Sequence, residues 1–372
     1  MSDTPGSVRS ARVYRSQLSQ EANDEGTQTM TGKERVIGVM SGRPVDRTPA
    51  MPILHTGLAA FAGVPLGRYF SDAGAMADVI AGGHERFGFD GVQLSLGVTG
   101  EAQALGAKVD QPPEGPPLLR EHVVKDYGVL DDLRRLDPAT GGRMPLYHAA
   151  VAEVSRRIGN RAFVLSTLRG PLNIASQLRG VEDVLVDMIE QPEAVGRLLD
   201  FATDMALRVA RPSLEAGADG LVFGEATASP NFISPKLYRS LVWPRHKRLV
   251  EEVRAMGWQC VGWHICGNIV PIIEDMIATG ADFFDVDHQV PAPRAIELSA
   301  GQVALRGNLD PIGVFFQGSA DKVRAETADL CRAVTGARWI AGSGCDIPPG
   351  TKLECVAAFA ETVAASGPSA GE

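Results

Sequence analysis

The sequence predicts an α/β protein that folds as one (β/α)8 TIM barrel. Eight apolar runs of six to eight residues alternate with longer segments of helical periodicity, which indicates βαβ units and a parallel sheet. These units occupy about 300 residues, close to the usual size of such a barrel. Polar and thiol side chains follow most of the apolar runs, where the carboxyl ends of barrel strands form active sites.

The predicted strands are rich in Val, Ile, Leu and Phe and are bounded by Gly, Pro, Asn or Asp. In chain order they span residues 48–54, 91–96, 162–168, 220–226, 259–266, 283–288, 303–309 and 338–345. Helical patterns such as residues 181–217 and 234–257 lie between them. A doubly wound open sheet is the alternative fold, and the absence of a GxGxxG motif after a first strand disfavours it.

Three segments lie outside the regular repeats. Residues 1–29 are rich in Ser, Thr, Gln, Glu and Asp and lack apolar periodicity, which predicts a disordered tail. The barrel domain is expected to cover residues 30–366 and to begin with a short helix at residues 31–42, capped by Thr31. Residues 97–160 are longer than one crossover needs, and their PPEGPP stretch predicts an excursion beside the barrel.

Composition narrows the classes of function. The 372 residues are 44% apolar and 22% charged, which is typical of a soluble globular protein. The net charge of −9 argues against a nucleic-acid partner, since such proteins usually present a basic face. No apolar run reaches the roughly 18 residues of a membrane span, and the N-terminus lacks the apolar part of a secretory signal. With five cysteines, an odd number, we expect a cytoplasmic protein with thiols rather than disulfides.

The stretch WHICGN contains two metal-binding side chains, His264 and Cys266, at the end of the fifth predicted strand. Residues two apart on a strand project to the same face. Cys345 ends the eighth predicted strand, and a barrel brings the carboxyl ends of its strands together. Two thiols and an imidazole favour zinc, and three ligands leave a fourth position open, as in catalytic zinc sites. The alternative is a set of small core residues, because free cysteine often packs in a core.

The other cysteines do not fit this site. Cys260 shares a predicted strand with Cys266 but lies about 20 Å away by strand rise. Cys331 and Cys355 fall in helical segments and are expected to be buried thiols. Four histidines away from predicted strand ends are expected to be surface or packing residues: His84, His122, His148 and His246.

Two glutamates are candidates for a catalytic role. Glu225 ends the fourth predicted strand and is a candidate for a resting fourth metal ligand or a proton shuttle; the alternative is a surface carboxylate at a loop start. Glu101 follows the second predicted strand and is expected to orient a ligand. Five further residues are the candidates for substrate binding: His55, Arg169, Asp287, Asn308 and Asp310. Asp310 has an alternative role as the cap of a helix that begins at Pro311.

Several motifs together resemble a known family. HICGN, ALRGNLDP and GSGCDIPPG are similar to segments of the uroporphyrinogen decarboxylase superfamily. Within it the chain is most similar to the corrinoid-linked, zinc-dependent methyltransferases of the methylcobamide:coenzyme M kind. The resemblance extends from Lys33 to the C-terminal helix and implies a (β/α)8 barrel. In that branch an H-x-C pair and a distant cysteine bind zinc, and those positions match His264, Cys266 and Cys345.

The resemblance implies a methyltransferase. A thiol activated by zinc would take the methyl group of methylcobalamin or another corrinoid. In an alternative reaction, zinc would assist the transfer of a methyl group from a methyl ether or amine to a Co(I) corrinoid protein. The corrinoid is expected on a separate protein, because the D-x-H-x-x-G motif that supplies an axial histidine is absent. The sequence leaves open the small-molecule methyl donor and acceptor, and also whether the chain forms a homo-oligomer.

Two alternative functions remain at this point. The decarboxylase itself carries an arginine-rich stretch after its first strand, which binds the substrate carboxylates, whereas residues 51–63 here contain no arginine. The other alternative is a non-catalytic protein that binds zinc or a corrinoid. A degenerate member of the family would be expected to lose a zinc ligand, and all three are present.

Overall fold

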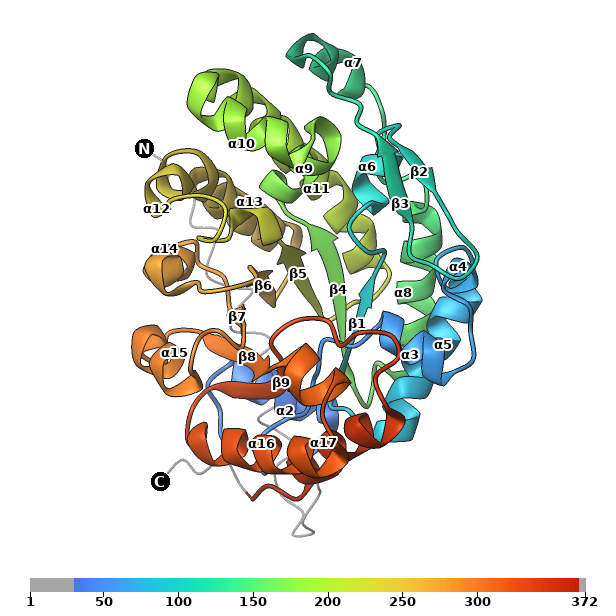
Figure 1. Cartoon of the computed structure of the whole chain (residues 1–372), viewed down its shortest axis with the longest axis vertical. Helices are drawn as coiled ribbons and strands as arrows, with labels where there is room; N and C mark the ends of the chain where they lie inside the picture. Colours follow the sequence, from blue (N-terminus) through green and yellow to red (C-terminus); the bar gives the residue numbers. More distant parts are fainter. Residues whose placement is uncertain (1–29, 368–372) are drawn as a thin grey trace, which may run out of the picture. The chain divides into compact units, whose positions relative to one another are not determined.

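Seven parallel strands form a curled sheet among residues 30–367, the part of the chain that the computed structural model describes. Their order across the sheet follows their order along the chain, with helices between them (Figure 1). They are β1 (Gly91–Ser95), β4 (Phe163–Arg169), β5 (Gly220–Gly224), β6 (Val261–His264), β7 (Phe283–Val286), β8 (Ala304–Leu309) and β9 (Trp339–Ser343). Each overlaps a predicted strand, which confirms the barrel rather than the doubly wound sheet. The predicted tail, residues 1–29, lies outside the described residues.

The first predicted strand, residues 48–54, occupies the eighth position of the barrel without forming a regular strand. Ala50 makes an isolated parallel bridge to Ala341 of β9, and its carbonyl accepts the N–H of Asp90, the residue before β1, at 2.8 Å. The segment therefore lies between the two ends of the sheet. Its two prolines lack an N–H, so a continuous ladder of hydrogen bonds cannot form. The prediction of a full strand is wrong for this reason, although its position is right.

The helices connect the strands, and the longer ones surround the curled sheet (Figure 1). They are α2 (Gly32–Met40), α3 (Thr56–Phe61), α4 (Leu66–Tyr69), α5 (Ala73–Phe87), α6 (Gly100–Ala104), α7 (Leu130–Leu133), α8 (Met144–Ile158), α9 (Pro171–Arg179), α10 (Val181–Glu190), α11 (Pro192–Glu215), α12 (Pro235–Leu237), α13 (Trp243–Met256), α14 (Ile273–Ala278), α15 (Ala292–Ser299), α16 (Ala320–Ala333) and α17 (Leu353–Ala364), with the short turns η1 (Tyr127–Val129), η2 (Ala226–Ala228), η3 (Tyr238–Val242), η4 (Val270–Ile272) and η5 (Pro311–Phe316). The predicted first helix is confirmed, since Thr31 and Glu34 cap α2 reciprocally.

The predicted excursion contains an antiparallel hairpin of β2 (Lys108–Asp110) and β3 (Leu118–Glu121). The proline-rich stretch that connects these strands cannot continue a ladder, because proline lacks the N–H donor. Pro116, Pro117 and Leu118 contribute to the wall of a cavity at the mouth of the barrel. The excursion therefore covers one side of the region where the active site is expected.

The seven strands of the curled sheet are buried on both faces, which explains their continuous apolar pattern. Among these seven, only β6 and β8 contain a half-buried residue, His264 in β6 and Asn308 in β8. Both lie at or near the carboxyl end of their strand, so solvent reaches the sheet from that edge. No helix within residues 30–367 is both long and apolar enough to cross a membrane.

Candidate metal centre and substrate cavity

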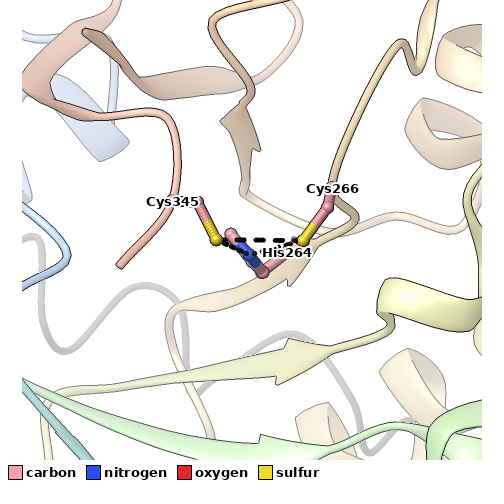
Figure 2. Close-up of side chains that lie close together, drawn as sticks. All are labelled: His264, Cys266 and Cys345. Atoms are coloured by element: carbon pink, nitrogen blue, oxygen red, sulfur yellow. Dashed lines mark hydrogen bonds between the residues drawn. The ribbon is translucent and has the colours of Figure 1, made fainter. Parts of the chain in front are cut away.

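Three metal-binding side chains converge at the carboxyl edge of the sheet. His264 is the last residue of β6, Cys266 follows it, and Cys345 lies just beyond the end of β9. The Nε2 atom of His264 lies 3.3 Å from the Cys266 Sγ atom and 3.6 Å from the Cys345 Sγ atom, and the two sulfur atoms are 3.9 Å apart. Figure 2 shows both thiols and the imidazole pointing toward one another, with His264 and Cys266 from the end of β6 and the loop after it, and Cys345 from the segment after β9.

These three distances match the edges of a tetrahedral zinc site. Zn–S bonds of about 2.3 Å and Zn–N bonds of about 2.0 Å place two sulfur atoms about 3.8 Å apart, and a sulfur and a nitrogen about 3.6 Å apart. Among the described residues, His264, Cys266 and Cys345 form a group of ligand atoms that all lie within 4.8 Å of one another, and no carboxylate joins it. The group could therefore hold a zinc ion and leave a fourth position free for a substrate atom.

A buried pair of charges fixes the His264 ring. The Nδ1 atom of His264 lies 2.9 Å from an oxygen of Asp285, and the Arg306 guanidinium donates to both Asp285 oxygens at 2.7 Å. Burial raises the pKa of Asp285, but the charge of Arg306 and the contact with His264 outweigh it, so the pKa is lowered overall. An ionised Asp285 accepts the Nδ1 proton and leaves Nε2 available to a metal ion.

Sequence reasoning missed Arg306, although a signal for it exists. An arginine inside an apolar run is rare, because a buried cation needs a partner. His264, Asp285 and Arg306 are paired in register across β6, β7 and β8, so that the imidazole, carboxylate and guanidinium lie side by side. That register is a property of the folded sheet.

Cys266 lies beyond the end of its strand, so the prediction that it shares a strand face with His264 is wrong. β6 ends at His264, and Gly267 has a φ of +81°, which turns the chain. One oxygen of Asp287 accepts the Gly267 N–H at 2.8 Å, and the other accepts the Gln289 N–H at 3.0 Å. The predicted substrate-binding role of Asp287 is corrected accordingly, because Asp287 holds the loop that carries Cys266.

The two thiols share a proton. The hydrogen bond with Cys266 lowers the pKa of Cys345, and the His264 contact acts in the same direction although burial opposes it. The same hydrogen bond, together with burial, raises the pKa of Cys266. The pair therefore retains one proton near neutral pH, which a metal ion would displace on binding.

Replacing Gly267 with alanine is expected to weaken metal binding. A positive φ costs a residue with a β-carbon about 1–2 kcal/mol, and here that atom would meet the Asn231 Nδ2 atom at 2.6 Å. Strain in this turn displaces the neighbouring Cys266 thiol, so we expect about tenfold weaker zinc retention in competition with a chelating dye.

Gly88→Ala is the matched control for Gly267→Ala. Gly88 ends α5 with a φ of +67°, and an added β-carbon there has no atom within 4 Å. Both variants should lose about 1–2 kcal/mol of unfolding free energy in urea, while the Gly88 variant keeps its zinc. Equal zinc retention in the two variants would show that the turn at Gly267 does not position Cys266.

Glu225 is engaged away from the metal-binding group. Its side chain is fully buried, and its two oxygens accept the N–H groups of Leu172 and Asn173, at the start of α9, at 2.9 and 2.8 Å. The Nε2 atom of His246 lies 3.0 Å from one of these oxygens, and the His246 ring stacks on Trp263. The prediction that Glu225 is a metal ligand or proton shuttle is corrected, because both oxygens are occupied by α9 and His246.

Glu101, on α6, supports Arg169 rather than a metal ligand. One of its oxygens accepts the backbone N–H of Arg169 at 2.7 Å. Burial raises the pKa of Glu101, and the nearby charge of Arg169 offsets only part of this shift. The expected role of orienting a metal ligand is therefore corrected: the residue that Glu101 holds is Arg169, at the end of β4.

A cavity of about 500 Å³ opens beside the metal-binding group. His55 and Arg169, which were both predicted to bind substrate, line it together with Cys266 and Cys345. Apolar residues form much of the remaining wall: Ile53, Leu66, Phe70, Leu96, Val98, Pro116, Pro117, Leu118 and Pro349. The Thr56 N–H donates to His55 Nδ1 at 3.0 Å, so a neutral His55 ring carries its proton on Nε2.

Asn308 and Asp310 do not line this cavity. They border a separate one of about 470 Å³ near α15 and α16. Asn308 donates to the Val290 carbonyl at 2.7 Å, and Asp310 accepts the Ile312 N–H at 2.8 Å as the cap of η5. Their predicted substrate-binding role is corrected, and the alternative for Asp310, a helix cap before Pro311, is confirmed.

The fold and these side chains define a class of protein: a parallel (β/α)8 barrel with a thiol-rich group that could hold a metal ion and a small, largely apolar cavity at its mouth. The chain matches the Uroporphyrinogen decarboxylase (URO-D) family over residues 31–366 and belongs to that family.

Curated relatives and a solved structure indicate which branch is most similar. The methylcobamide:CoM methyltransferase MtbA of Methanosarcina mazei is 29% identical over 85% of this chain and 93% of its own length. The methylcobamide:CoM methyltransferase MtaA of Methanosarcina barkeri is 25% identical over 88% of this chain and 96% of its own length. A uroporphyrinogen decarboxylase of Prochlorococcus marinus is 24% identical over 75% of this chain and 79% of its own length. A solved methyltransferase from Methanosarcina mazei has a TM-score of 0.83 at 26% identity and covers 90% of this chain and 98% of its own. These findings confirm the resemblance to the methyltransferase branch.

Proposed function

We propose that this protein transfers a methyl group between a corrinoid and the sulfur atom of a small thiol, with zinc bound by His264, Cys266 and Cys345. The observation that carries the proposal is the convergence of two thiols and one imidazole, at tetrahedral spacing, on the wall of a small cavity. The similarity to methylcobamide:CoM methyltransferases supports it.

Each residue of the proposed site has a distinct task. Zinc held there would lower the pKa of a thiol at its free position and so favour the thiolate nucleophile. His264 would bind through Nε2, because Asp285 accepts the proton on Nδ1. Asp287 would keep the Cys266 thiol in place through the Gly267 N–H. The apolar wall of the cavity would exclude water from the attacking sulfur.

In the proposed reaction the sulfur attacks the methyl carbon of methylcobalamin in line. An S–C bond forms while the Co–C bond breaks, and both electrons of the broken bond stay on cobalt, which leaves as Co(I). The cavity suits a small thiol. The much larger corrinoid would then dock at the barrel mouth, carried by a separate protein in the cytoplasm.

The cavity gives little support to porphyrinogen decarboxylation. Among the residues that line it, one arginine and no lysine are present. A tetrapyrrole with several carboxylates would require several cationic partners. The same conclusion follows from the absence of arginine in residues 51–63.

Methyl transfer can be tested with purified protein, methylcobalamin and a panel of small thiols, followed by the absorbance of methylcobalamin and of Co(I) or Co(II). We expect protein-dependent transfer that stops after zinc is removed with a strong chelator. Adding back about one equivalent of zinc should restore the rate, since the site binds one ion. Release of carbon dioxide from a porphyrinogen by the chelated protein, without methyl transfer to any thiol, would overturn the proposal.

A further inference from the structure

Two of the cysteines have their sulfur atoms in contact. The Sγ atoms of Cys266 and Cys345 are 3.9 Å apart, and all five cysteines of the chain are free thiols within residues 30–367. Figure 2 shows the two sulfur atoms facing each other across this contact. A disulfide bond is about 2.05 Å long, so an approach of about 1.9 Å would join them. The pair that could hold a metal ion is therefore also placed to form a disulfide.

The same pair is the one that an oxidant in solution can reach. Cys266 and Cys345 are half-buried and line the cavity at the barrel mouth. The other three cysteines are buried: Cys260, Cys331 and Cys355. The oxidation of a cysteine depends on its exposure, so a small oxidant is expected to react first with Cys266 or Cys345.

The surroundings of the pair leave room for the two sulfur atoms to approach each other. Neither residue belongs to a strand or helix, since Cys266 follows the end of β6 and Cys345 follows the end of β9. The cavity of about 500 Å³ beside them leaves one side of each thiol without packed neighbours. Side-chain rotation with small shifts of the two loops can therefore supply the approach without breaking the hydrogen-bonded ladder of the sheet.

We propose that the metal-free pair of Cys266 and Cys345 is a modification site for hydrogen peroxide, which oxidises the two thiols to a disulfide. One sulfur attacks a peroxide oxygen, the O–O bond breaks, and a sulfenic acid and a first water molecule form. The second sulfur attacks the sulfenic sulfur, so that the S–S bond forms, the S–O bond breaks and a second water molecule leaves. The two thiols together lose two electrons and two protons, which reduce the peroxide to water.

Formation of the disulfide and binding of a metal ion exclude each other. Zinc binds cysteine as the thiolate, which a disulfide no longer offers. Bound zinc would engage both sulfur atoms and hold them about 3.8 Å apart, so the S–S bond could not form. Small thiols reverse the oxidation by exchange, in which two of them become joined as a disulfide. Reversal by a methyl-accepting thiol rests on the proposed function; formation of the disulfide does not.

The test counts the thiols of the full chain, once with zinc bound and once after a chelator has removed it. Both samples are treated with excess hydrogen peroxide, denatured, alkylated with a maleimide and measured by mass spectrometry. The metal-free protein should lose two of its five thiols, and the zinc-loaded protein should keep all five. Peptide mapping should identify a single cross-link, between Cys266 and Cys345. The oxidised protein should take up no zinc until dithiothreitol has reduced it.

Two variants and an unfolded sample are the controls. In Cys345→Ser the partner thiol is missing, so Cys266 should gain oxygen atoms instead of forming the cross-link. Cys331→Ala changes a buried thiol on α16 outside the pair, and this variant should lose two thiols as the wild type does. Metal-free protein oxidised in urea should give a mixture of cross-links, because the fold no longer selects which thiols meet.

The outcomes distinguish this inference from the proposed function. Five intact thiols after oxidation of the metal-free protein, or the same mixture of cross-links with and without urea, would overturn the inference even if methyl transfer occurs. Equal loss of thiols in the zinc-loaded and metal-free samples would contradict the protection by zinc. A single cross-link between Cys266 and Cys345, without methyl transfer to any thiol, would support the inference and overturn the proposed function.

Discussion

Replacing Cys345 with alanine is expected to remove most of the bound zinc and to lower the rate of methyl transfer by about a thousandfold or more. Cys345 supplies one of two sulfur donors, and its Sγ atom lies 3.6 Å from His264 Nε2. Without it, Cys266 and His264 would form a two-ligand site, which is too few for catalytic zinc. Loss of Lewis-acid stabilisation worth several kcal/mol corresponds to this change in rate. Metal analysis of the purified protein and the methylcobalamin assay measure the two effects.

Cys331→Ala is the matched control for this experiment. Cys331 is also a buried thiol, but it lies on α16 and does not belong to the metal-binding group. The control should therefore lose some packing energy and keep about one zinc per chain and its activity. If Cys345→Ala and Cys331→Ala contain equal amounts of zinc, the three-residue site does not exist as proposed.

Replacing Arg306 with alanine should lower the free energy of unfolding by about 3–5 kcal/mol, because it leaves a buried carboxylate without its partner. Arg306 and Asp285 are 0% and 1% exposed, and two hydrogen bonds of 2.7 Å join them. The substitution should also weaken zinc binding, because an Asp285 side chain that rotates or becomes protonated no longer orients His264. We expect zinc affinity to fall by about 10- to 100-fold, the usual effect of losing such a supporting residue.

Arg324→Ala provides the comparison for Arg306→Ala. Arg324 pairs with Asp321 at 2.8 Å, but both side chains are exposed, so this pair is expected to contribute about 1 kcal/mol or less. Urea unfolding of the two variants measures the difference that burial makes. A double-mutant cycle with Asp285→Asn isolates the coupling between the two buried residues. Similar unfolding free energies for Arg306→Ala and Arg324→Ala would contradict the importance assigned to the buried pair.

The roles of the carboxylates were the part of the site that the sequence predicted poorly. Asp287 and Glu225 both lie at the ends of predicted strands, and both hold backbone N–H groups of other segments. Asp285, which was assigned no role, orients His264. A carboxylate at a strand end looks the same in a sequence whether it faces the cavity, a neighbouring strand or a helix N-terminus. Which of these the carboxylate faces depends on the φ and ψ angles of its residue and on which N–H groups of distant segments lie near it.

By itself, the sequence determined the fold class, seven of the strands and the three side chains of the candidate metal site. These features depend on local properties: apolar periodicity, the chemistry of thiols and imidazole, and the rule that barrel strands meet at their carboxyl ends. Only the tertiary structure decided that residues 48–54 close the barrel without a ladder, that Arg306 secures Asp285, and that Arg169 lies across Gly224. Each of these depends on register between segments far apart in the chain, and register is set by packing of the whole barrel rather than by any single segment.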